Sequence, residues 1–165
     1  MLERLAACDA LTGLPNRRAL EDAIRRASAR QKRGAESMLL FLDADNFKTI
    51  NDTVGHIAGD QALATFAYAI ENCLRADDFL ARVGGDEFAV LLDQTGIEEA
   101  TEIAERIRKA VESHNFVLDG QEFRLGVSVG MVSVSGENPW SLMSRADKAM
   151  YKAKSKGRNQ IVLAK

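Results

Sequence analysis

Cysteine is scarce in this sequence, because Cys8 and Cys73 are the only two thiols among its 165 residues. Neither belongs to a CxxC pair or to another spacing typical of a metal site. Two isolated cysteines are typical of a protein from a reducing compartment rather than of a disulfide scaffold. The sequence therefore predicts two reduced thiols in a cytoplasmic protein, and neither has a role in the chemistry inferred below.

Long apolar runs and a surplus of basic residues are also lacking. No stretch approaches the ~20 apolar residues that a membrane-spanning helix needs. The N-terminal "MLERLAACDA" lacks the apolar core of a signal peptide, because Glu3, Arg4 and Asp9 interrupt it. The net charge of −2 does not favour binding to duplex DNA or RNA. We expect a soluble chain with no membrane segment and with no nucleic acid polymer as partner.

Helical patterns alternate with strand patterns along the chain, and its length and 46% hydrophobic content predict one compact domain. Asn16 is the expected N-cap of a first helix that ends before Gly34. Thr95 and Glu98 form a capping-box pattern ahead of a later helix. Apolar periodicity and these end signals predict four helices, over residues 16–34, 59–78, 95–111 and 138–157.

Strand patterns fill most of the remaining sequence. The run "MLLFLDAD", which begins at Met38, is typical of a strand buried on both faces with carboxylates at its exit. Residues 79–92 alternate on either side of two glycines and predict a hairpin. Residues 123–134 predict a strand with a bulge at Gly130, and residues 159–164 a short final strand. These elements predict an α/β (α+β) fold, with a mixed central sheet flanked by helices.

Four acidic residues follow strand patterns at two places in the sequence. Asp43 and Asp45 end the buried strand, and Asp86 and Glu87 lie on the hairpin. If the two elements are neighbours in the sheet, these carboxylates converge at one edge and form a site for a hard cation such as Mg²⁺. That arrangement favours phosphoryl or nucleotidyl transfer. The alternative is that all four are solvated turn residues, and spacing alone leaves both interpretations open.

Two further polar groups have a functional and a structural interpretation. Lys154 and Arg158 lie four residues apart near the end of a predicted helix, where they can hold a triphosphate or complement the helix dipole. Asn51 and Asp60 belong to a predicted loop before a helix, where they can read the edge of a base or form turns. Composition does not separate these options.

Four separated motifs resemble the GGDEF-domain diguanylate cyclases in content and order: "DALTGLPNRRAL", "DADNFKTINDTVGHIAGDQAL", "RVGGDEF" and "ADKAMYKAKSKGRNQ". The resemblance spans residues 9–165. It implies a ferredoxin-like palm, related to the palm domains of nucleotide cyclases and polymerases. It also implies that residues 1–8 are the end of a helical stalk that connects an upstream sensor domain to the cyclase.

The family condenses two GTP molecules into cyclic di-GMP and releases two pyrophosphates, with two protomers facing each other. By resemblance, Asp43, Asp86 and Glu87 are catalytic, and two Mg²⁺ (or Mn²⁺) ions per active site are bound by these residues and the Ala44 carbonyl. The division of roles between Asp86 and Glu87 stays open. The resemblance further implies a set of substrate-binding residues: Asn51 and Asp60 for guanine, Gly84 and Gly85 for close approach of the nucleotide, and Lys48, Lys154 and Arg158 for phosphates.

Arg75 and Asp78 in "RADD" resemble the RxxD site at which the family binds cyclic di-GMP as an inhibitor, and Arg106 is a candidate second arginine of that site. The alternative function is a catalytically silent module that binds GTP or cyclic di-GMP and signals without turnover. The intact "GGDEF" hairpin favours the enzyme over this alternative.

Overall fold

The computed structural model describes residues 6–165, and its central part has the order βαββαβ. The elements of that part are β1 (Met38–Ala44), α3 (Phe47–Glu71), β2 (Phe79–Gly84), β3 (Glu87–Leu92), α4 (Ile97–Ser113) and β6 (Val127–Ser133). The remaining elements are α2 (Arg17–Gln31), β4 (Phe116–Leu118), β5 (Gln121–Phe123), α5 (Pro139–Ser155) and β7 (Ile161–Leu163). The order is that of a ferredoxin-like fold with additions at both ends and with β4 and β5 inserted between α4 and β6.

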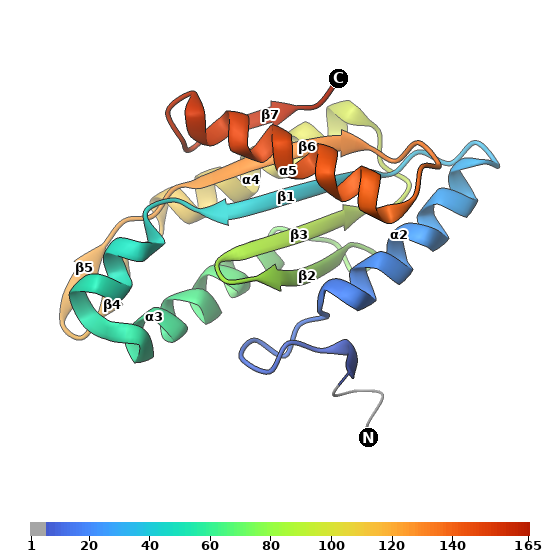
Figure 1. Cartoon of the computed structure of the whole chain (residues 1–165). Helices are drawn as coiled ribbons and strands as arrows, with labels where there is room; N and C mark the ends of the chain where they lie inside the picture. The colour runs from blue at the N-terminus through green and yellow to red at the C-terminus, as the bar shows by residue number, and fades with distance from the viewer. Residues whose placement is uncertain (1–5) are drawn as a thin grey trace.

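The main sheet has the strand order β2-β3-β1-β6-β7, in which only β6 and β7 are parallel. Helices α2 and α5 pack on one face, whereas α3 and α4 pack on the other, as Figure 1 shows. β4 and β5 form a separate hairpin that the sequence analysis did not predict. The predicted mixed sheet with flanking helices is confirmed.

β1 is the central strand, and all seven of its residues are buried. Leu40 and Leu42 pack toward α3 and α4, whereas Leu39 and Phe41 pack toward α2 and α5. A strand covered on both faces needs an apolar side chain at every position rather than at alternate ones. This explains the uninterrupted "MLLFL" run and confirms the predicted buried strand.

The predictions for helix ends have mixed outcomes. Asn16 caps α2 by accepting a hydrogen bond from the Ala19 N–H at 3.1 Å, and Asn138 caps α5 in the same way. The capping box at Thr95 is wrong, because the N-cap of α4 is Gly96 and has no side-chain cap. The Thr95 hydroxyl instead donates to the Asp93 carbonyl at 2.7 Å.

The predicted start of the second helix is wrong, because α3 begins at Phe47 instead of Gly59. The buried side chains of Phe47 and Ile50 anchor an extra segment at its N-terminal end. Gly55 then interrupts the helix with φ 85° and ψ 172°, a backbone conformation that glycine adopts without a Cβ penalty. Because of this interruption, the first segment cannot be predicted by extending the apolar periodicity of the rest of the helix.

The predicted bulge at Gly130 is also wrong. β6 pairs with β1 in an unbroken register, with Gly130 opposite Phe41. Glycine is needed here for packing, because an added Cβ would lie 2.3 Å from both the Ala146 carbonyl oxygen and the Met150 nitrogen of α5. Val127 to Val132 are all buried, so apolar residues occupy both faces of β6 without a bulge.

Candidate active site at the ends of strands β1 and β3

The acidic residues of the buried strand and of the hairpin meet at one end of the sheet. Asp43 on β1 lies directly opposite Glu87 on β3 in the antiparallel register. Asp86 occupies the turn before Glu87, and its carbonyl accepts a hydrogen bond from the Ala44 N–H at 3.4 Å. The structure therefore brings Asp43, Asp86 and Glu87 together, as expected if the two strands are neighbours.

Asp43 is the most deeply buried acid of this group, with 5% of its surface exposed. Its Oδ2 contacts the ammonium group of Lys154 from α5. Its Oδ1 is buried and has no hydrogen-bond partner among the described residues. The pKa of Asp43 is raised to about 7, because burial and the nearby Asp86 together outweigh the opposing effect of the Lys154 ammonium group. A buried carboxylate oxygen without a partner is uncommon, and its lone pairs are available to coordinate a cation.

Glu87 borders an open cavity of about 500 Å³, which is also lined by Asp43, Lys154, Asp147 and Tyr151. Burial raises the pKa of Glu87, and the charges of Asp147 and Asp86 raise it further. The sequence analysis missed Asp147. It precedes Lys154 by seven residues on α5, which is two helical turns, and that spacing places both residues on one face.

Asp45 does not join the other acids, so the expected convergence of four carboxylates is wrong in this respect. Its Oδ1 accepts from the Ser128 hydroxyl at 2.6 Å, and its Oδ2 accepts from the Asn159 N–H at 2.8 Å. Asp45 is buried with both oxygens used. It therefore ties the end of β1 to β6 and to the segment after α5.

Asn51 and Asp60 lie on α3, on opposite sides of its interruption at Gly55, so their predicted position in a loop is wrong. The interruption folds the two segments against each other, since an added Cβ at Gly59 would lie 1.8 Å from the Asn51 Oδ1. Asp60 is the next residue and is exposed. The structure thus places both polar residues at one corner of α3.

The three predicted phosphate-binding residues, Lys48, Lys154 and Arg158, lie on different segments of the chain. Lys48 is exposed in the first turn of α3. Arg158 lies beyond the end of α5 in a left-handed conformation with φ 64°, so it does not share a helical face with Lys154 as expected. The neighbouring Asn159 bonds to Asp45, which holds the Arg158 backbone beside the end of β1.

The oxygen donors at this site suit a hard divalent cation that takes its remaining ligands from outside the chain. Within residues 6–165, no group of three His, Cys, Asp or Glu side chains gathers as a metal site by itself. Asp43, Asp86 and the Ala44 carbonyl offer only oxygen ligands, which Mg²⁺ prefers, and Mg²⁺ commonly uses one or two carboxylates together with phosphates and water.

The RxxD residues form a second polar cluster between α3 and α4. The Arg75 guanidinium contacts the Asp78 Oδ1 at 3.3 Å and the Glu99 Oε1 at 2.8 Å. The Arg75 N–H also donates to the Asp78 Oδ2 at 2.9 Å. Arg106 donates to the Cys73 carbonyl at 3.3 Å. The structure therefore brings Arg75, Asp78 and Arg106 into one region.

The βαββαβ fold, with acids converging at the ends of β1 and β3, defines a palm domain of the class found in nucleotide cyclases and polymerases. Residues 6–160 match the family model described as "Diguanylate cyclase, GGDEF domain", and the chain belongs to this family. Within residues 6–165, no helix combines the length and hydropathy needed to cross a membrane.

Similar proteins share both the sequence and the fold. Diguanylate cyclase DgcP of Pseudomonas aeruginosa is 41% identical over 161 residues, covering 96% of this chain. This chain spans 24% of that protein's length. The crystal structure of diguanylate cyclase SiaD in complex with its activator SiaC, also from P. aeruginosa, has a TM-score of 0.92 and 39% identity, over 99% of this chain and 64% of that chain.

A further structure contains the coiled coil and GGDEF domain of DgcB from Caulobacter crescentus in complex with c-di-GMP. It has a TM-score of 0.91 and 35% identity, over 99% of this chain and 88% of that chain.

Proposed function

We propose that this chain is a diguanylate cyclase domain that condenses two GTP molecules into cyclic di-GMP. Each 3′-oxygen forms a bond to the α-phosphorus of the other nucleotide. The bond from that phosphorus to the oxygen that bridges the α- and β-phosphates breaks, so that two pyrophosphates leave. The observation that carries the proposal is the pairing of Asp43 with Glu87 across β1 and β3, with a buried Asp43 oxygen that has no hydrogen-bond partner within residues 6–165. Family membership and the similarity to DgcP and SiaD support it.

The acidic residues take the metal-binding role in this proposal. Asp43, Asp86, Glu87 and the Ala44 carbonyl hold two Mg²⁺ (or Mn²⁺) ions together with the triphosphate. When bound, the ions lower the pKa of the attacking hydroxyl and neutralise charge on the leaving pyrophosphate. Asp43 binds as the carboxylate, and Glu87 binds metal or accepts the proton of the 3′-hydroxyl.

The basic residues and glycines position the nucleotide. Lys154, whose ammonium group contacts Asp43, binds the β- and γ-phosphates together with Arg158 and Lys48. Gly84 and Gly85 leave the turn backbone open, because an added Cβ at either position meets no atom within 4 Å. That free space admits the nucleotide.

Guanine is read by Asn51 and Asp60 at the corner of α3. The Asp60 carboxylate accepts hydrogen bonds from the base N1–H and N2–H₂, a donor pair that adenine does not present. The exposed position of Asp60 beside Gly59 and Asn51 supports this role.

Catalysis requires two copies of the domain, each presenting one GTP to the other, so the active form is a homodimer. We further propose that Arg75 and Asp78, with Arg106, bind cyclic di-GMP as a feedback inhibitor. The structure of the coiled coil and GGDEF domain of DgcB in complex with c-di-GMP supports a ligand of this class.

In the proposed organisation, residues 9–165 form the cytoplasmic cyclase domain and residues 1–8 end a stalk from a sensor domain. Residues 1–5 of that stalk lie outside the described part of the chain.

The test is chromatographic. Nucleotide-free protein at high concentration is incubated with GTP and Mg²⁺ beside Glu87→Gln, and cyclic di-GMP and pyrophosphate are quantified. Product from the parent alone supports the cyclase. If the protein binds GTP but forms no product, even after a parallel coiled-coil dimer is fused before Leu5, the chain is the silent binding module instead.

A further inference from the structure

The edge of the sheet formed by β7 carries a groove next to the cavity that Glu87 borders, and Lys148 and Lys152 line both. β7 pairs with β6 alone, and α5 packs beside it (Figure 1). Between α5 and β7 lies a groove of about 450 Å³. Val162 and Leu163 contribute apolar surface to this α5–β7 groove, whereas Lys148, Lys152 and Lys156 line it with positive charge.

The three lysines form a basic stripe without ion pairs among the described residues, although Asp147 and Glu87 line the neighbouring cavity together with Lys148 and Lys152. They are spaced by four residues, so they follow one flank of α5 and its end. Within residues 6–165, none of their ammonium groups lies within 4.0 Å of a carboxylate. Arg145 at the same rim, in contrast, is paired with Glu137.

The helix dipole does not account for the whole stripe. Its effect is confined to the last helical turn, and Lys148 lies about two turns before the end of α5 at Ser155. The chain as a whole carries a net charge of −2, so the concentration of positive charge is local to this groove.

The backbone of β7 is open on the side away from β6. The Val129 N–H donates to the Gln160 carbonyl at 2.9 Å, and the Ala164 N–H donates to the Met131 carbonyl at 2.7 Å. Because peptide groups along a strand point alternately to its two sides, the groups of Leu163 point away from β6. In the part of the chain that the structure describes, no strand covers this edge. Such an edge accepts an additional strand.

We propose that the α5–β7 groove binds an extended acidic segment of a partner protein, which adds to β7 as a further strand. Lysines four residues apart on a helix are spaced by about 6 Å along its axis. Side chains on one face of a strand repeat every two residues, or roughly 6.6 Å. Carboxylates at alternate positions of the segment therefore match Lys148, Lys152 and Lys156.

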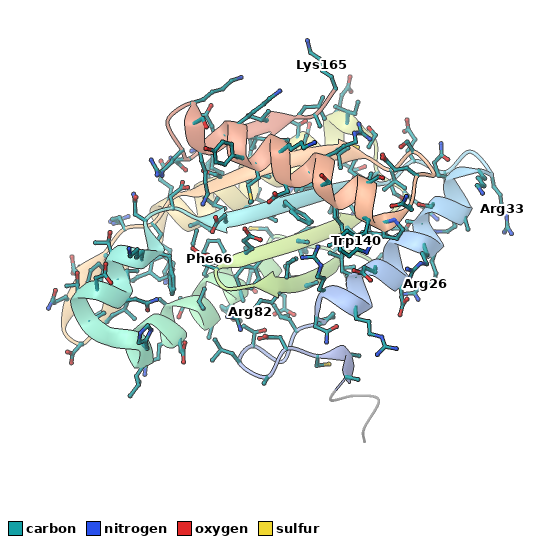
Figure 2. The ribbon with its side chains drawn as sticks, in the orientation of Figure 1. Arg26, Arg33, Phe66, Arg82, Trp140 and Lys165 are labelled. Carbon is teal, nitrogen blue, oxygen red and sulfur yellow. The ribbon has the colours of Figure 1, made fainter. Side chains whose placement is uncertain are left out.

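The apolar surface and the strand edge favour a peptide over other polyanions. Figure 2 shows Lys165 extending away from the fold near this edge. Lipid headgroups or RNA phosphates would satisfy the lysines but would leave Leu163, with 42% of its surface exposed, and the free backbone groups of β7 without partners. Binding of such a segment does not require the proposed cyclase activity.

The first experiment measures fluorescence anisotropy with a labelled peptide of alternating Glu and Val residues. We expect saturable binding to the parent chain and an affinity about tenfold lower in the triple variant Lys148→Gln, Lys152→Gln, Lys156→Gln, since three exposed charge pairs are lost. A matched triple variant, Lys32→Gln, Arg33→Gln, Lys109→Gln, removes three exposed cations elsewhere and should bind like the parent. Equal binding by both triple variants overturns the proposal.

A second experiment separates strand addition from simple charge attraction. Leu163→Pro removes an outward N–H and leaves the hydrogen bonds to β6 intact, so it should weaken binding, with circular dichroism confirming its fold. A peptide of the same sequence with N-methyl groups on alternate amides should also bind the parent chain more weakly. This comparison requires no substitution in the protein. Unchanged affinity of the N-methylated peptides rules out strand addition. If the peptide does not bind, but phosphatidylserine vesicles or single-stranded RNA bind in a way that depends on the lysines, the groove is a site for that ligand instead.

Discussion

Arg82 of β2 joins the glycine turn to the N-terminal segment. Its Nη1 donates to the Asp9 Oδ1 at 2.9 Å, and its Nε and Nη2 donate to the Gly85 carbonyl at 3.0 and 2.8 Å. The Arg82 and Asp9 side chains are only 16% and 18% exposed. The turn that carries Asp86 is therefore held in place through Arg82 by Asp9, which lies 73 positions before Arg82 in the chain.

Asp9→Asn should lower the free energy of unfolding by about 1–2 kcal/mol at pH 7, because Arg82 loses its charged partner. Burial tends to raise the pKa of Asp9, but hydrogen bonds from Thr12 and Arg82 outweigh it and hold that pKa below its ordinary value. The stabilisation is therefore present above the unfolded pKa of about 3.9 and is lost as the pH falls through the folded pKa.

Urea unfolding of the parent and Asp9→Asn at pH 7 and at about pH 2 checks this. Asp22→Asn is the control, because Asp22 pairs with Arg25 where both side chains are more than half exposed, and its effect should be close to zero. An Asp9→Asn defect of the same size at both pH values would contradict the assignment.

Asp43→Asn should stabilise the metal-free chain at pH 8 while it abolishes turnover. Since the folded pKa of Asp43 is raised to about 7, ionisation of this buried group destabilises the fold. The cost is absent below the unfolded pKa of about 3.9 and develops as the pH rises toward the folded value. Thermal unfolding with a chelator should show a higher Tm for the variant at pH 8 and no gain at about pH 4. A lower Tm at pH 8 would show that the Lys154 contact outweighs burial.

Gly130→Ala should destabilise the chain by about 3 kcal/mol or more, because the new methyl group meets backbone atoms of α5 that have no free rotation to move away. Gly84→Ala is the matched glycine, and its added Cβ meets no atom within 4 Å. We expect Gly84→Ala to fold with normal stability and to bind GTP weakly, since the methyl group takes nucleotide space. Urea denaturation and GTP titration separate the two effects, and normal GTP affinity in Gly84→Ala would remove the turn from the binding site.

Asp60→Ala should weaken GTP binding by about tenfold to a hundredfold, the usual effect of losing a charged hydrogen-bond acceptor. Asp52→Ala removes an exposed carboxylate from the same helix, beside Asn51, and should leave GTP affinity within about twofold. Isothermal titration with GTP and with ATP measures both variants. If Asp60→Ala and Asp52→Ala have equal GTP affinities, Asp60 does not read guanine.

Arg75→Ala should relieve inhibition by added cyclic di-GMP and leave the initial velocity similar. Glu99→Gln removes one ion pair of Arg75 but keeps the arginine and Asp78, so it should remain inhibited. Initial rates over a range of cyclic di-GMP concentrations distinguish the variants. The RxxD assignment fails if Arg75→Ala is inhibited as strongly as the parent.

Much of the fold follows from local patterns in the sequence. Residues close together in the sequence are enough to predict the unbroken apolar run of β1, the hairpin around Gly84 and Gly85, and the caps at Asn16 and Asn138. The short β4–β5 hairpin and the first segment of α3 were not predicted. Each strand of the β4–β5 hairpin has only three residues, which is too few for a clear periodicity. In α3, the non-helical conformation of Gly55 separates the first segment from the rest of the helix.

The sequence by itself determined the element types, the family resemblance and the candidate acids, because side-chain periodicity, caps and motifs are local. Only the tertiary structure decided which acids share a site. Asp45 and Asp43 are two residues apart, yet Asp45 is bound by Ser128 and Asn159, while Asp43 faces Glu87 across the sheet. Asp147 joins them from α5. Strand register and helix packing bring distant residues together, and those contacts depend on the complete fold rather than on sequence spacing.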